Sequence, residues 1–197
     1  MSDMLSAFTL SMPSWFDAFA GLLPDHVKSP VEGMAIIIEL SMLNIVHDTG
    51  GPFAAGVFES GSGRIISLGV NRVMAHNCSS AHAEIMALSL AQKRRGMYDL
   101  GGKGMPSHDL YVNWLPCTMC FGAVLWSGVK RLVIAGHGGE LEEITGFDEG
   151  PRPANWKEEL TRRKIEVLDG VMRNEAIEVF REFRDRGSTV YNARQRE

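Results

Sequence analysis

The chain has 197 residues, 45% hydrophobic and 22% charged, which is enough to bury the core of one ordinary globular domain. Its net charge of −4 weighs against nucleic acid as a partner, because nucleic acids are held mainly by Lys and Arg contacts to phosphate. No apolar run is long enough to span a membrane, and the first residues lack the basic stretch of a secretory signal, so we expect a cytoplasmic protein.

The first part of the chain is predicted to be helical. Ser14 and Asp17 have the spacing of a capping box that opens a short helix. A longer helix is predicted after Ser29, which can serve as the N-cap, with Pro30 at the first helical position. A turn-forming cluster at 48–52 is expected to end this second helix.

Two apolar stretches, at 53–59 and 64–70, flank a loop of serine and glycine and predict a β-hairpin. Helices and strands then alternate along the chain. The predicted order is a polar loop at 71–80, a helix at 81–95, a strand at 109–114, a helix at 117–127, a strand at 131–135, a long loop at 136–155, a helix at 155–163, a strand at 165–168 and a helix at 171–186. This order indicates an α/β fold, in which a mixed five-stranded sheet lies between helices in a three-layer α/β/α sandwich.

Two distant motifs have the residue types and spacing of a zinc site. His82 lies in the sequence Ala-His-Ala-Glu, and Cys117 and Cys120 lie in Pro-Cys-Thr-Met-Cys. One imidazole and two thiolates can fill three corners of a tetrahedral zinc site and leave the fourth for water. Both motifs stand at predicted helix starts, where free N–H groups favour thiolate over thiol. We therefore predict one Zn²⁺ per subunit, whereas Cys78 has no partner at ligand spacing and is expected to be a plain thiol.

The glutamate in the first motif, Glu84, is not needed as a ligand and is free to carry protons. A zinc ion with two thiolates has no net charge and acidifies water less than a tri-histidine site, so a general base beside that water is expected. Together the motifs form the H-x-E and P-C-x-x-C signature of zinc-dependent nucleobase deaminases. The sequence thus predicts a hydrolytic deaminase.

On these motifs the chain resembles the cytidine deaminase superfamily, from residue 53 to about residue 135. Four further stretches resemble the small zinc-dependent guanine deaminases of bacteria: Gly-Gly-Pro-Phe at 50–53, Gly-Val-Asn-Arg-Val at 69–73, Ala-Val-Leu-Trp at 123–126 and Gly-Phe-Asp-Glu at 146–149. The resemblance implies a cytidine deaminase-like domain at 51–186. Residues 1–50 would then be a helical extension packed on its core, and 187–197 a C-terminal tail.

The resemblance also implies roles for residues in and near these stretches. In guanine deaminases of this type, the Gly-Phe-Asp-acid loop brings a second carboxylate to the pocket, which passes a proton to the leaving amine. The matching residue is Glu149, with Asp148 as its neighbour and competitor, although the family more often has aspartate at that position. Asn71 matches the asparagine that reads the purine edge, since an amide can donate and accept in one plane. The other candidate substrate-binding residues are Phe53, Ala83, Trp126 and Tyr191.

Guanine deaminases of this type are dimers that exchange C-terminal segments. The resemblance therefore implies a homodimer, in which Tyr191 of each tail closes the site of the partner subunit. The predicted substrate is a small nucleobase, with no role for a membrane or for nucleic acid.

The predicted reaction converts guanine to xanthine and ammonia, with amino-triazines such as ammeline as further candidate substrates. Glu84 takes a proton from water, the hydroxide attacks C2, and ammonia leaves with a proton supplied through Glu84 and Glu149. Three alternatives remain open: a tRNA adenosine deaminase, a cytosine or cytidine deaminase, and a zinc-stabilised binding module without turnover. A tRNA adenosine deaminase would need a basic surface to bind tRNA. A binding module without turnover is disfavoured because Glu84, the expected proton carrier, is present.

Overall fold

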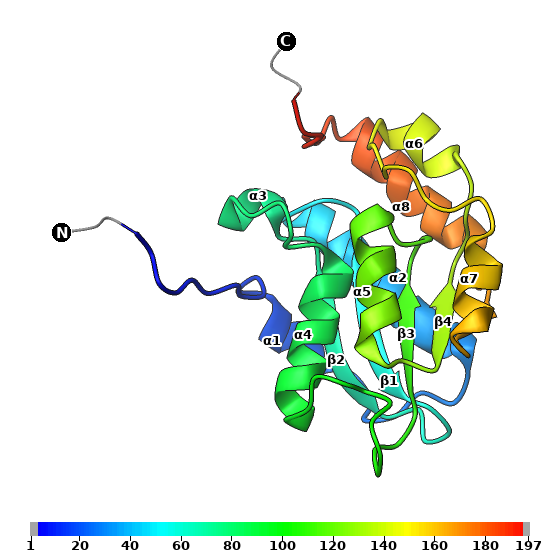
Figure 1. Cartoon of the computed structure of the whole chain (residues 1–197). Helices are drawn as coiled ribbons and strands as arrows, with labels where there is room; N and C mark the ends of the chain where they lie inside the picture. The colour runs from blue at the N-terminus through cyan, green and yellow to red at the C-terminus, as the bar shows by residue number, and fades with distance from the viewer. Residues whose placement is uncertain (1–3, 195–197) are drawn as a thin grey trace.

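A five-stranded mixed sheet runs through the centre of the computed structural model, which describes residues 4–194 (Figure 1). The strands lie in the order β2-β1-β3-β4-β5, with β1 antiparallel to both of its neighbours and β3, β4 and β5 parallel to one another. Their bounds are Ala54–Glu59 for β1, Ile65–Val70 for β2, His108–Val112 for β3, Arg131–Ile134 for β4 and Glu166–Leu168 for β5. The predicted α/β fold with a mixed five-stranded sheet is confirmed.

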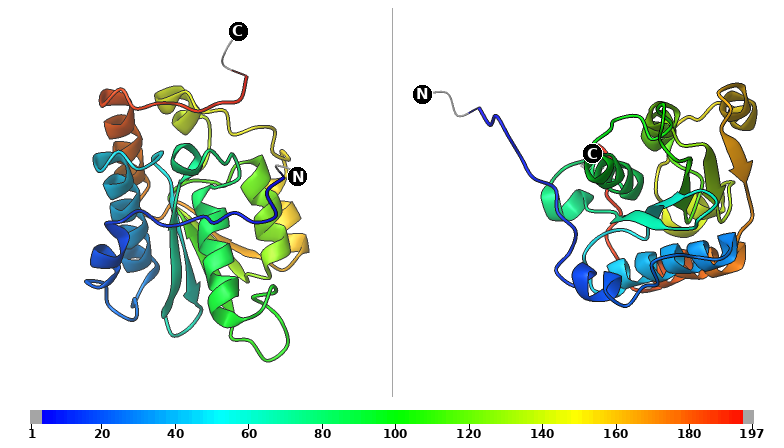
Figure 2. Two further views of the ribbon diagram at one scale, coloured as in Figure 1. Left: turned by 90° about the vertical axis from the view of Figure 1, so that its left-hand side faces the viewer. Right: turned by 90° about the horizontal axis from the view of Figure 1, so that it is seen from below.

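Helices cover both faces of this sheet and make it the middle of three layers (Figure 2). One face is covered by α2 (Pro30–Val46) and α8 (Arg173–Asp185), and the other by α4 (Ala83–Arg95) and α5 (Thr118–Ser127). The helix α7 (Trp156–Arg162) precedes β5 and contacts it. Across residues 4–194, no helix is both long and apolar enough to cross a membrane.

The longest helix, α2, begins where the sequence predicts. The Ser29 side chain accepts a hydrogen bond from the Glu32 backbone N–H at 3.2 Å, and the Glu32 carboxylate accepts one from the Lys28 N–H at 2.8 Å. These two bonds satisfy N–H groups that a helix start leaves without partners. The predicted capping box at Ser14 is wrong, because α1 (Phe16–Ala20) has Trp15 at its N-cap and no side-chain capping bond.

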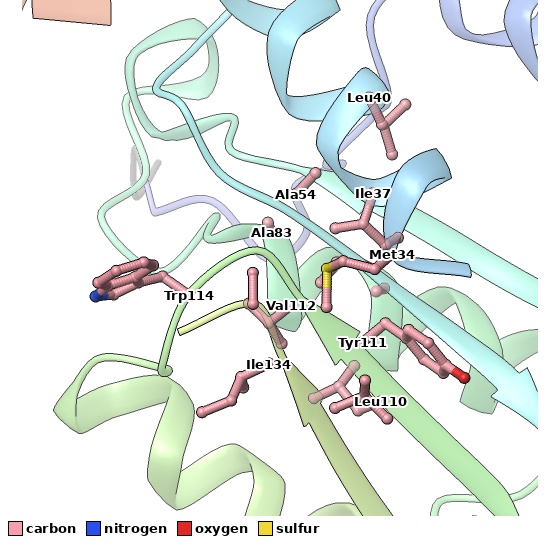
Figure 3. Close-up of a cluster of buried hydrophobic side chains, with 14 of the residues drawn as sticks. Met34, Ile37, Leu40, Ala54, Ala83, Leu110, Tyr111, Val112, Trp114 and Ile134 are labelled. Carbon is pink, nitrogen blue, oxygen red and sulfur yellow. The ribbon is translucent and has the colours of Figure 1, made fainter. Parts of the chain in front are cut away.

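The core between α2 and the sheet combines aliphatic and aromatic side chains. Met34, Ile37 and Leu40 of α2 face Ala54 of β1 and Tyr111 of β3 (Figure 3), while Leu110 and Val112 lie on the opposite face of β3. Burying a side chain of this size stabilises a fold by roughly 1.5–3 kcal/mol. This packing holds the sheet against α2. The opposite face of the sheet is covered by α4 and α5, and the two motifs lie at the starts of these helices.

Two segments predicted as loops contain short helices. The loop at 71–80 includes α3 (Val73–His76), and the loop at 136–155 includes α6 (Glu140–Thr145). The four residues of α3 are too few to establish a helical period. In α6 the acidic residues that suggested a loop occupy the first turn, where negative charge stabilises a helix, while Leu141 is buried.

Candidate active site

The first motif lies at the start of α4. His82 is the N-cap residue, with extended backbone angles (φ −73°, ψ 157°), and its side chain makes no capping bond. The helix start is held against β2 by Gly69, because a Cβ atom there would lie 2.4 Å from the Ala83 carbonyl oxygen and 2.5 Å from the Ala87 nitrogen. Glycine at position 69 therefore lets the first turn of α4 pack closely on β2, which fixes the positions of His82 and Glu84 relative to the sheet.

The second motif lies at the start of α5, in the same relation to its helix. Cys117 is the N-cap residue, and its carbonyl oxygen accepts a hydrogen bond from the Phe121 N–H at 2.7 Å. The connection from β3 is fixed by the buried side chain of Asn113, which accepts from the Ala54 N–H at 3.0 Å and donates to the Pro52 carbonyl at 2.8 Å. Both helices thus begin at the same end of the sheet.

The two helix starts bring three candidate ligands together. The ligand atoms of His82, Cys117 and Cys120 all lie within 4.8 Å of one another, the one such group of His, Cys, Asp and Glu found in the described part of the chain. A hydrogen bond from the Cys120 thiol lowers the pKa of Cys117 to about 4, and the same bond, with burial, raises the pKa of Cys120. A lowered pKa favours the thiolate form of Cys117, which is the form that binds a metal ion. One imidazole and two sulfurs in a closed cluster are a donor set that suits Zn²⁺.

Glu84 lies beside this cluster and is not one of its three ligands. Its side chain is almost fully buried, with 6% of the residue exposed. Burial raises the pKa of Glu84, and the negative charge of Cys117 raises it further. The carboxyl group therefore binds a proton more readily than an exposed glutamate, which is a property of groups that accept and return protons in catalysis.

The Gly-Phe-Asp-Glu loop brings a second carboxyl group to the same place. The Glu149 carbonyl accepts a hydrogen bond from the Thr118 N–H at 3.0 Å, and the Glu149 side chain is 11% exposed. Burial raises the pKa of Glu149 to about 8, with contributions from the charges of Cys117 and Glu84. Asp148 is exposed, and its carboxylate accepts a bond from the Gly150 N–H at 2.9 Å. Of the two acids, it is Glu149 that lies at the cluster.

Polar and aromatic side chains lie beside the cluster. Asn71 is fully buried, accepts a bond from the Val73 N–H at 3.3 Å, and donates through its side-chain nitrogen to the Tyr191 hydroxyl. The ring of Tyr191 lies 6.5 Å from the His82 ring, centre to centre. In this structure the tyrosine therefore comes from the same chain as the ligands.

Phenylalanine rings stand behind Tyr191. The ring centres of Phe147 and Tyr191 are 4.8 Å apart, and those of Phe53 and Phe147 are 5.2 Å apart. Phe53 also lies 6.2 Å from Phe180 of α8, so this aromatic group continues into the core. Phe53 thus supports Tyr191 from behind, through Phe147.

Two other predicted substrate-binding residues differ in their placement. Ala83 is fully buried in the first turn of α4 and belongs to the hydrophobic core. Trp126 is 86% exposed, and it is not brought together with the other predicted residues within this chain.

The third cysteine, Cys78, is half-buried, and its sulfur lies 3.2 Å from the Ser80 hydroxyl oxygen.

Two residues at the site were not anticipated. Asn192 accepts a bond from the Asp148 N–H at 2.9 Å and donates to the Gly146 carbonyl at 2.7 Å, which fastens the tail to the loop that carries Glu149. Arg152 donates to the Pro116 carbonyl at 3.3 Å and lies 3.8 Å from the Glu149 carboxylate. The Asn192 bonds and the Arg152–Pro116 bond join segments that only the fold brings together, so no sequence pattern indicates them, whereas Arg152 and Glu149 are three residues apart.

Residues 31–136 match the family model described as the cytidine and deoxycytidylate deaminase zinc-binding region. The chain belongs to this deaminase family. The match includes both motifs, so the predicted superfamily is confirmed, and the cluster of His82, Cys117 and Cys120 lies in the zinc-binding region of a deaminase.

Among solved structures, the deaminase is similar to NE0047 in complex with 2,6-diaminopurine, with a TM-score of 0.88, 46% identity, and coverage of 97% of this chain and 100% of the other. It is also similar to a structure reported for guanine deaminase from Nitrosomonas europaea, with a TM-score of 0.86, 44% identity, and coverage of 93% of this chain and 100% of the other. A curated relative is the tRNA-specific adenosine deaminase of Buchnera aphidicola subsp. Schizaphis graminum, 33% identical over 120 residues, which are 61% of this chain and 72% of the relative.

Proposed function

We propose that this protein is a zinc-dependent guanine deaminase, which hydrolyses guanine to xanthine and ammonia. The observation that carries the proposal is the convergence of Glu149, Asn71 and Tyr191 on the cluster formed by His82 and the two cysteines. The likeness to a guanine deaminase and to a protein that binds 2,6-diaminopurine extends over more than nine-tenths of this chain. It therefore extends well beyond residues 31–136, which the family model matches.

The buried polar groups of the pocket suit the edge of a purine. The Asn71 side-chain oxygen is engaged by the Val73 N–H, which fixes the orientation of the amide and leaves its nitrogen to face the pocket. That nitrogen now donates to Tyr191, and it can donate to an acceptor on the purine ring when substrate is present. The ring of Tyr191, which packs against Phe147, offers apolar surface to a flat base.

The chemistry is divided between the metal and two carboxyl groups. Zinc, when bound, supplies a Lewis acid that makes water a better nucleophile at neutral pH. Glu84 takes the proton from the attacking water and delivers it to the ring nitrogen next to C2. Glu149, whose pKa of about 8 keeps it protonated at neutral pH, donates to the amine as the C–N bond breaks. The new C2 hydroxyl gives its proton to Glu84 as the carbonyl forms, and this proton restores the acid form of Glu149. Guanine and water thus give xanthine and ammonia, and both carboxyl groups return to their starting states.

The test is ammonia release from guanine, cytosine, cytidine, adenine and ammeline by the zinc-loaded protein. We expect guanine to be the preferred substrate. Turnover of cytidine without turnover of guanine would contradict the proposal while leaving the family assignment intact. Ammeline is a further candidate, since its amino-triazine ring matches the pyrimidine half of guanine.

A second candidate is the reaction of the tRNA-specific relative. The basic residues that could form a tRNA-binding face are partly neutralised here, because Arg162 and Arg163 on and after α7 both pair with Glu159, at 3.0 and 2.8 Å. Incubating the protein with tRNA and sequencing for inosine distinguishes the two activities. We expect no inosine.

Three finer features are also proposed: one zinc per subunit, a homodimer, and action in the cytoplasm. The dimer is supported by exposed apolar side chains on α5, where Trp126 is 86% exposed and Met119 39% exposed, because such surface is usually covered by a partner. Three free cysteines suit a reducing compartment. Zinc analysis and sedimentation of the purified protein test the first two features.

The predicted exchange of tails between subunits stays a prediction. It can be tested by mixing two inactive variants, Glu84→Gln and Tyr191→Ala, under conditions in which subunits exchange. If each tail closes its own site, as in this chain, no activity returns. If the tails are exchanged, one site of each hybrid dimer regains both residues, and activity returns.

A further inference from the structure

The N-terminal segment passes along the open edge of the sheet. That edge is β2, and the segment is bonded near both of its ends. At one end the Ser11 carbonyl accepts a bond from Arg72 at 3.2 Å. At the other end the Asp25 carbonyl accepts from the Ile65 N–H at 3.1 Å, and the Val27 N–H donates to the Gly63 carbonyl at 2.9 Å. Between these contacts α1 lies near the β2 edge, on the side of the sheet that α2 covers (Figure 2).

A cavity of about 740 Å³ lies between α1, β2 and α4. Its apolar walls include Phe16 and Leu23 from the N-terminal segment, Leu68 from β2 and Leu90 from α4. The volume is that of a site for a small organic molecule. The cavity is lined by residues in the last turns of α4, whereas the zinc ligand His82 lies at the start of the same helix. Leu90 and Arg94 lie 8 and 12 residues after His82, so the two places are about 12–18 Å apart along the helix.

Positive charge gathers at this cavity on a chain whose net charge is −4. Arg64, Lys93 and Arg94 line it, and none of them has a carboxylate within ion-pair distance among residues 4–194. The Arg94 guanidinium donates to the Ile66 carbonyl at 2.7 Å, which holds it at the strand edge. Of the two acids in the lining, Glu59 is already paired with Arg95 at 2.6 Å, outside the cavity. Asp25 alone opposes the three cations.

We propose that this cavity is a binding site for a nucleoside phosphate. The base and sugar would pack against Phe16, Leu23 and Leu68, and the phosphate would lie among the three cations. Arg and Lys are the side chains that proteins use to hold phosphate, and the missing carboxylate partners leave them available. A peptide added to β2 fits less well, because Ile65 N–H and Ile66 C=O are already bonded.

Calorimetric titration of the zinc-loaded protein with each of the four common nucleoside 5′-monophosphates tests the proposal. Guanosine and inorganic phosphate serve as probes of the two halves of the ligand. We expect at least one monophosphate to bind about tenfold or more tightly than either half alone, since the walls and the cations act together. The absence of measurable binding for all four would overturn the proposal.

Charge reversal locates the binding. Arg64→Glu and Lys93→Glu are each expected to weaken the nucleotide about tenfold or more, because each replaces an attraction with a repulsion. The matched control is Lys103→Glu, which changes the net charge equally on an exposed loop outside the cavity. Equal affinity in the wild type and both cavity variants would place the nucleotide elsewhere and overturn the proposal. Binding is measured directly, so failure of the guanine assay leaves this test intact.

Discussion

The pocket has one half built on regular structure and another half built on loops. His82, Glu84 and the two cysteines belong to the first turns of α4 and α5, which are packed on the sheet. Glu149 and Tyr191 lie in segments without helix or strand, held mainly by side-chain bonds such as those of Asn192. The metal-binding half is thus fixed before substrate arrives, whereas the closing half can move at the cost of a few hydrogen bonds.

The largest expected effect is in the fixed half, at Glu84. Glu84→Gln keeps the shape of the side chain and removes its capacity to carry protons, so kcat should fall by about 10³-fold or more. Zinc content, measured by metal analysis, should stay at the wild-type level because this residue is not a ligand. Near-normal activity in a zinc-loaded Glu84→Gln protein would contradict the assigned role.

A smaller loss, about 10²-fold in kcat, is expected for Glu149→Gln in the closing half. Since Glu149 acts as a proton donor with a pKa of about 8, wild-type activity should decline as the pH rises through about 8 and the group loses its proton. The variant should lack this alkaline decline in its pH–rate profile. A matched control is Glu143→Gln on the exposed side of α6, which should leave both rate and profile unchanged.

Gly69→Ala tests how rigidly the first half is held. The new Cβ would come within 2.5 Å of α4 backbone atoms, so the start of the helix must shift. We expect a loss of stability of about 1–3 kcal/mol and weaker zinc retention, measured by thermal unfolding and by dialysis against a chelator. Gly21→Ala, after α1, is the control, because a Cβ there meets only the Asp17 and Ala18 carbonyl oxygens at 3.4 and 3.7 Å, which are ordinary van der Waals distances. Equal stability of both variants would show that α4 is not fixed by this contact.

The smallest effect is expected at the tail. Asn192→Ala removes two bonds to the loop at 146–148, each with a net contribution of about 1 kcal/mol, so the closed arrangement should be less populated. KM for guanine should rise several-fold and the unfolding temperature should fall by a few degrees, while zinc content stays the same. An unchanged KM would mean that other contacts keep the tail closed, and the division of the pocket into a fixed and a movable half would fail.

The same division explains what could be predicted from the sequence. The zinc ligands and Glu84 follow from short local patterns at helix starts, and the hairpin and α4 follow from periodic apolar residues. The bonds of Asn192 to the loop at 146–148 and of Arg152 to Pro116 join distant segments, so no local pattern predicts them. Trp126 illustrates another limit: it lies nine residues after Cys117 (126 − 117 = 9), which at about 100° per residue places it on the opposite side of α5. The resemblance of residues 123–126 to guanine deaminases is local in sequence, whereas the exposure of Trp126 depends on which face of α5 it occupies.

The backbone bonds between the N-terminal segment and β2 have a consequence for handling the protein. An uncovered edge strand offers its N–H and C=O groups to the edge of another sheet, which leads to aggregation. A protease that cuts within the exposed residues near Leu22 would release this cover while leaving the zinc ligands in place. Nicked molecules would therefore precipitate during storage before their catalytic rate per folded molecule had changed.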